Sequence, residues 1–94
     1  MTTEGQLQGY TKKQAKKLGI GFYKMVCEGK SGFPDVLLVY NGKSVFIELK
    51  SPTGNGRLSK LQQVRIDELR ALGATAYVIS TKDGIDNALK EITH

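Results

Sequence analysis

The sequence predicts an α/β fold in which a mixed four-stranded sheet is flanked by helices, in the order α-β-β-β-α-β-α. Two strand-like runs joined by Asn-Gly form the centre of the chain, and amphipathic helical segments precede and follow them. A further strand-like run follows the second helical segment. That segment is long enough for a right-handed crossover, which would return the last strand beside a central one.

The first helix is predicted to begin at Thr2 or Thr3 and to end at Gly19. Threonine caps the free N–H groups at a helix start, and an acid in the first turn suits the helix dipole. Glycine adopts the left-handed conformation that commonly ends a helix. The helical repeat places five residues on one inward stripe: Glu4, Leu7, Thr11, Ala15 and Leu18. Four lysines occupy the far side as a solvated basic face: Lys12, Lys13, Lys16 and Lys17.

Three strands are expected next. The first covers Ile20–Glu28, in which Cys27 should pack as a small apolar residue. The second and third, Asp35–Tyr40 and Lys43–Lys50, flank Asn41-Gly42. This dipeptide favours a type I′ hairpin because both central residues of that turn have a positive φ.

The hairpin register brings charged residues together at one end. With Asn-Gly as the loop, Asp35 lies opposite Glu48, and Glu48 shares a face of the sheet with Lys50. Two carboxylates placed this way suit Mg²⁺ or Mn²⁺ better than Zn²⁺. The alternative is an edge hairpin whose acids point into water beside Lys50.

The second helix is predicted over Lys60–Leu72, before Gly73. Ser59 followed three residues later by Gln62 forms a capping box at its start. The helical repeat places Gln62 on one arc with Leu58, Ile66 and Leu69, so Gln62 should point inward among apolar neighbours. A buried amide needs partners, which either the cap alone or a nearby carboxylate could supply. A strand over Ala74–Ser80 and a helix from Thr81 or Asp83 to about Ile92 complete the chain.

Composition restricts the class of function. The chain has 94 residues and a formal net charge of +5, which points toward a polyanionic partner, nucleic acid or a membrane surface. Cys27 is the one cysteine, which excludes an internal disulfide. Because His94 is also the one histidine, most zinc sites and most catalytic sites built from cysteine and histidine are excluded. No apolar run approaches a membrane span, and the N-terminus has no signal-peptide core. We therefore expect a soluble protein of the cytoplasm.

Several motifs together resemble a known family. Pro34-Asp35, followed by Glu48-Leu49-Lys50, is similar to the signature of the PD-(D/E)xK nuclease superfamily. This signature is preceded by Gly32-Phe33 and followed by Leu58-Ser59-x-x-Gln62 and Leu69-x-x-Leu72-Gly73-Ala74. With these motifs in this order, the chain resembles the VRR-NUC (virus-type replication-repair nuclease) family, in its stand-alone phage and bacterial form. The resemblance covers nearly the whole chain and implies a restriction-endonuclease-like core, with residues 1–94 as one nuclease domain and nothing left for an accessory DNA-binding domain.

The resemblance implies a metal site. By position, Asp35 and Glu48 would be metal-coordinating carboxylates, and the backbone carbonyl of Leu49 a further ligand. The cofactor would be Mg²⁺ or Mn²⁺, and the sequence leaves open whether one or two ions bind.

The resemblance also implies catalytic roles for three more residues. Lys50 would position or activate the attacking water and stabilise charge on the phosphate. An acid on the first helix completes the family's site, and Glu4 is the acidic residue available there. Gln62 matches the family's glutamine on the helix that follows the catalytic strands.

The expected function is metal-dependent endonuclease cleavage of DNA. No base-reading helix stands out, so we expect structure-selective cleavage rather than sequence-specific restriction. Stand-alone members of the family resemble Holliday-junction resolvases, which work as dimers. The resemblance therefore implies a Holliday junction or other branched DNA as the substrate, cut by a homodimer in a bacterial or phage-infected cell. The alternatives are a flap or single-strand nuclease of the same family, a non-catalytic nucleic-acid-binding module and a protein-binding adaptor. Backbone phosphates would be bound by Lys12, Lys13, Lys16, Lys17, Lys24, Lys30, Arg57 and Lys60.

Overall fold

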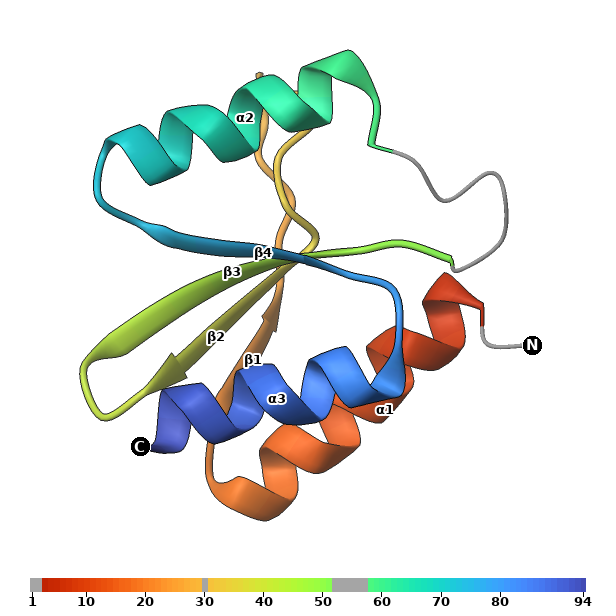
Figure 1. The fold of residues 1–94 in the computed structure, drawn as a ribbon, viewed down its shortest axis with the longest axis vertical. Coiled ribbons are helices and arrows are strands. Elements are labelled where there is room, and N and C mark those ends of the chain that lie inside the picture. The colour runs from red at the N-terminus through yellow and green to blue at the C-terminus, as the bar shows by residue number, and fades with distance from the viewer. Residues whose placement is uncertain (1–2, 30, 52–57) are drawn as a thin grey trace.

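The computed structural model describes residues 3–29, 31–51 and 58–94, and its elements follow the predicted order (Figure 1). The elements are α1 (Glu4–Leu18), β1 (Gly21–Lys24), β2 (Val36–Tyr40), β3 (Lys43–Leu49), α2 (Lys60–Ala71), β4 (Thr75–Ile79) and α3 (Lys82–Thr93). None of the helices within these described ranges has the length and apolar character of a membrane span.

The sheet has the strand order β1-β2-β3-β4. The first two pairings are antiparallel, and β4 lies parallel to β3 after the α2 crossover. The predicted hairpin register is confirmed, since Tyr40 pairs with Lys43 and Val36 pairs with Ile47. The turn residues Asn41 and Gly42 have φ values of 47° and 82°, as a type I′ turn requires.

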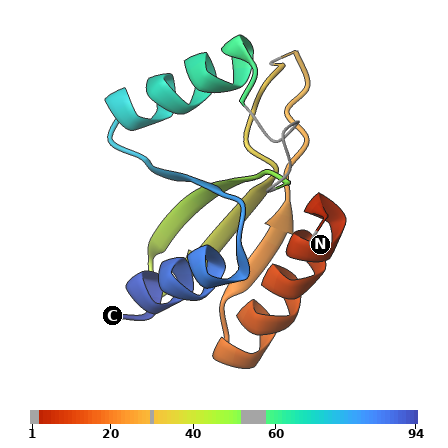
Figure 2. The same cartoon turned by 45° about the vertical axis from the view of Figure 1, so that its right-hand side comes forward.

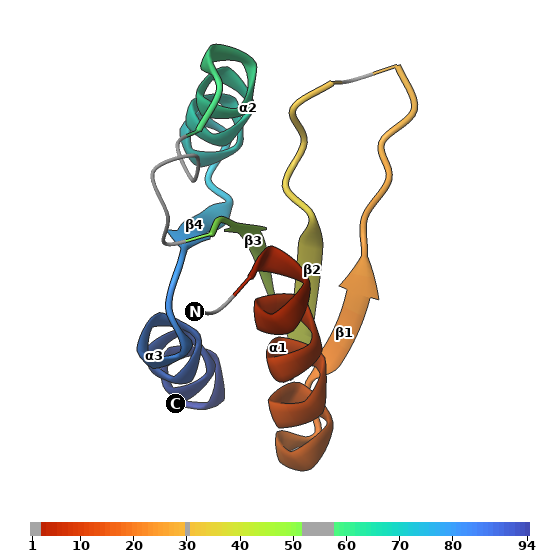
Figure 3. The same ribbon diagram turned by 90° about the vertical axis from the view of Figure 1, so that its right-hand side faces the viewer.

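Helices cover both faces of the sheet. Figures 2 and 3 show α1 and α3 together on one face and α2 on the other. The main core lies on the α1/α3 face, where Leu7, Ile47 and Ile85 are fully buried. Side chains alternate along a strand, so Glu48 points to the opposite face, where Gln62 of α2 contacts it. The candidate site therefore lies on the α2 side of the sheet.

The helix starts follow the predicted capping residues. Thr3 caps α1 and Ser59 caps α2, each in a reciprocal capping box with the residue three positions later. Thr81 rather than Asp83 caps α3. Gly19 ends α1 with a φ of 73°.

Two expectations about the first half of the chain are wrong. The first strand ends at Lys24, so Cys27 lies beyond it and is half-buried. The last backbone hydrogen bond between the two segments runs from the N–H of Met25 to the Asp35 carbonyl, just before β2 begins at Val36. Leu18 is 48% exposed because the chain turns at the helix end and Ile20 fills the inward position instead.

Candidate active site

Glu48 is the centre of the candidate site. It sits near the end of β3 and is only 2% exposed. Its Oε2 accepts a hydrogen bond from Nε2 of Gln62 at 3.2 Å and lies 3.4 Å from Nζ of Lys50, whose side chain is 12% exposed. The predicted convergence of Glu48 and Lys50 on one face of the sheet is therefore present in the fold.

The second carboxylate oxygen of Glu48 has a different environment. Oε1 is buried and accepts no hydrogen bond from the described residues. Burial, and after it the nearby charge of Asp35, raise the pKa of Glu48 to about 7, although Lys50 opposes both effects. A buried carboxylate oxygen without a donor, beside a second carboxylate, fits a divalent cation.

Asp35 reaches the site at the end of the connection from β1 to β2. Gly32 lies in this connection with a φ of 80°, and a Cβ there would lie 2.8 Å from the carbonyl carbon of Leu61. The connection can therefore approach the start of α2 closely only with glycine at this position. The ring of Phe33 packs edge-on against Phe46 of β3, with ring centroids 5.5 Å apart. These contacts place Asp35 one residue before the β2–β3 ladder and close to Glu48.

Gln62 has both of the roles that its sequence pattern left open. Its Oε1 accepts from the backbone N–H of Ser59 at 2.9 Å, which completes the capping box. Its Nε2 donates to Glu48. The start of α2 is thereby connected directly to the carboxylate of β3.

Glu4 lies at the rim of the site. Its side chain is exposed rather than inward, and its Oε1 accepts from the backbone N–H of Ser51 at 3.4 Å. In the described part of the chain, no group of three or more His, Cys, Asp and Glu side chains could hold a metal ion. The structure therefore brings Glu4 to the chain segment directly after Lys50, but not into a carboxylate cluster with Asp35 and Glu48.

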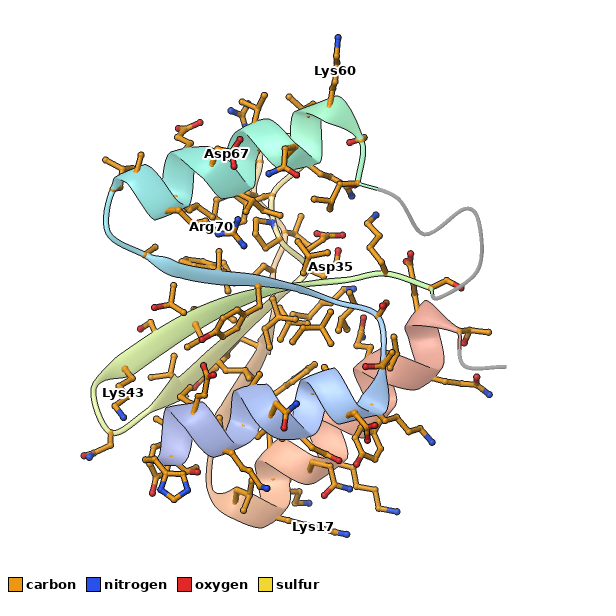
Figure 4. All side chains as sticks on the ribbon, viewed as in Figure 1. Lys17, Asp35, Lys43, Lys60, Asp67 and Arg70 are labelled. Atoms are coloured by element: carbon orange, nitrogen blue, oxygen red, sulfur yellow. The ribbon has the colours of Figure 1, made fainter. Side chains whose placement is uncertain are left out.

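The proposed phosphate-binding residues are spread over the molecule. Figure 4 shows Lys17 and Lys60 at opposite ends, with Asp35 between them. Lys17 follows Glu4 by thirteen positions in the helix, which is about 20 Å along the axis. Lys30 and Arg57 lie outside the described residues. The other six are exposed: Lys12, Lys13, Lys16, Lys17, Lys24 and Lys60.

Leu49 ends β3 between Glu48 and Lys50, and its side chain is buried in the main core. This burial fixes the end of the strand between the two charged residues. Gly32 belongs to the motif that carries the family resemblance, but no local pattern indicated its close approach to Leu61.

Comparison with known proteins identifies the family. Residues 6–83 match the VRR-NUC domain. A relative named "Putative nuclease p44", from Acyrthosiphon pisum secondary endosymbiont phage 1, is 31% identical over 81 residues, 85% of each chain. A solved structure named "VRR_NUC domain" has a TM-score of 0.84 and 30% identity over 96% of this chain and 97% of that one. Another, "VRR_NUC domain protein", shares the fold with a TM-score of 0.74 and 21% identity over 98% and 88% of the two chains. The chain therefore belongs to the VRR-NUC domain family.

Proposed function

We propose that the protein is a Mg²⁺- or Mn²⁺-dependent endonuclease that hydrolyses phosphodiester bonds of DNA. Family membership supports a nuclease. The observation that carries the metal dependence is the buried Oε1 of Glu48, which accepts no hydrogen bond from the described residues and belongs to a carboxylate close to Asp35. A buried carboxylate oxygen without a hydrogen-bond donor is costly, so this arrangement is expected where a cation supplies the missing partner.

The proposed ligands are all oxygen atoms. The carboxylates of Asp35 and Glu48 would hold the cation, with the backbone carbonyl of Leu49 as a third ligand. Such hard oxygen donors suit Mg²⁺ and Mn²⁺. When bound, the cation would supply Lewis acidity to the phosphate and lower the pKa of a water molecule.

The remaining residues act through charge and orientation. The ammonium of Lys50 lies 3.4 Å from Glu48, so it would add fixed positive charge where negative charge develops on the phosphate. It would also position or activate the attacking water. Gln62 holds the Glu48 carboxylate in one orientation through its hydrogen bond, and Glu4 would complete the rim beside Ser51.

The proposed substrate is a Holliday junction or other branched DNA. One chain carries one candidate site, so cutting two strands would require a homodimer. The exposed lysines of α1, together with Lys24 and Lys60, would bind backbone phosphates without reading bases. Such an enzyme would act in the cytoplasm of a bacterium or a phage-infected cell.

A cleavage assay tests the proposal. Purified protein is incubated with fluorescent linear, flap and four-way junction DNA in Mg²⁺, Mn²⁺ or EDTA, beside the variants Asp35→Ala and Lys50→Ala. Metal-dependent cutting of junctions that both variants lose would support the proposal. Preference for flaps or single strands would favour the other nuclease activity. Binding without cutting in either metal would favour a binding module, and neither binding nor cutting would favour an adaptor.

A further inference from the structure

The connection from β1 to β2 is attached to α2 by a second contact besides Gly32. Nε of Arg65 donates a hydrogen bond to the backbone carbonyl of Ser31 at 3.0 Å. Nη1 of the same guanidinium donates to Oε2 of Glu68, also at 3.0 Å, and the Arg65 side chain is 19% exposed. A guanidinium is planar with fixed donor directions, so these two bonds hold it in one orientation.

The same helix contacts Glu48 and the segment that leads into Asp35. Gln62 lies three residues before Arg65, so the two side chains are neighbours on the helix surface. Gln62 bonds directly to Glu48 of β3, whereas Arg65 bonds to the segment that leads into Asp35. Figure 1 shows this segment passing behind α2 on its way to β2. The position of α2 therefore affects both carboxylates.

We propose that Arg65 is a positioning residue for the metal site. It holds the segment before Asp35 against α2 and so keeps the carboxylates of Asp35 and Glu48 close together despite their like charge. This inference rests on the proposed metal-dependent function. A guanidinium cannot ligate a cation, so any effect of Arg65 on metal affinity must pass through the segment that it holds.

Arg70 provides a matched control. It lies on the same helix, and its Nε and Nη2 donate to the backbone carbonyl of Ala76 at 3.1 and 2.8 Å. Arg65→Met and Arg70→Met therefore each remove an arginine-to-carbonyl anchor of α2, but only Arg65 anchors the segment before Asp35. Circular dichroism and urea unfolding establish that both variants fold, and isothermal titration calorimetry measures Mg²⁺ and Mn²⁺ affinity without DNA.

Arg65→Met is expected to weaken Mg²⁺ binding about tenfold, as loss of a group that orients metal ligands commonly does. Its cleavage of DNA should recover at saturating Mg²⁺, and Arg70→Met should keep wild-type metal affinity even where it is equally destabilised. Equal metal affinity in Arg65→Met and wild type, or an equal loss in both variants, would overturn this inference alone. Wild-type protein that binds neither metal would overturn the proposed function as well. If Arg65→Met does not fold, Arg65→Gln replaces it and the same results decide.

Discussion

The substitution Glu48→Gln should make the metal-free protein more stable at alkaline pH while abolishing cleavage. Folding raises the pKa of Glu48 from 4.5 to about 7, chiefly by burial. The folded protein therefore binds the proton more tightly than the unfolded chain, and the free energy of unfolding falls as pH rises between these two values. Glutamine resembles the protonated acid in shape and carries no charge at any pH.

The size of this effect follows from the shift in pKa. Each pKa unit corresponds to about 1.4 kcal/mol, so Glu48 should cost the wild-type protein about 2–3 kcal/mol of stability between about pH 5 and about pH 8. Because Glu48 is 2% exposed, solvent screens little of this cost. Glu48→Gln should lack this pH dependence and be the more stable protein at the higher pH.

Urea unfolding in EDTA at the two pH values measures the difference. Glu28→Gln, which removes an exposed carboxylate, serves as the control and should follow the wild type. Adding Mg²⁺ should restore the stability of the wild type at the higher pH, but not change that of Glu48→Gln, because a ligand stabilises only the folded state that binds it. Parallel pH dependence in wild type and Glu48→Gln would refute the reasoning about burial.

Three further variants have distinct expected outcomes. Lys50→Ala should lower the cleavage rate about 100-fold or more while retaining Mg²⁺ binding by calorimetry, because its charge acts on the phosphate rather than on the metal. Gly32→Ala should destabilise the fold by more than Gly29→Ala, as measured by urea unfolding. Both glycines have a positive φ, but of the two only Gly32 would place a Cβ against the backbone of α2. Equal losses of unfolding free energy in the two variants would contradict this close approach. Replacing Lys16 and Lys17 with alanine should weaken DNA binding equally for all sequences and reduce the slope of log affinity against log salt by about 2, measured by fluorescence anisotropy.

The sequence by itself predicted those features that depend on neighbouring residues. Asn41-Gly42 determined the hairpin turn and with it the register that brings Glu48 toward Asp35. Thr3 and Ser59 determined where two helices begin, because a cap acts within three residues of itself. The alternation of side chains placed Glu48 and Lys50 on one face of the sheet.

Tertiary structure decided what depends on elements distant in the chain. The depth at which Glu48 is buried, and its hydrogen bond with Gln62, follow from where the crossover lays α2 on the sheet. No local pattern encodes the approach of Gly32 to Leu61, since two segments 29 residues apart meet there only after folding. The lysines of α1 form a face by helical repeat, but their distance from the candidate site is determined by the packing of the whole helix. Local patterns thus brought Asp35, Glu48 and Lys50 together, and packing of the helices against the sheet determined how deeply Glu48 is buried and that Gln62 reaches it.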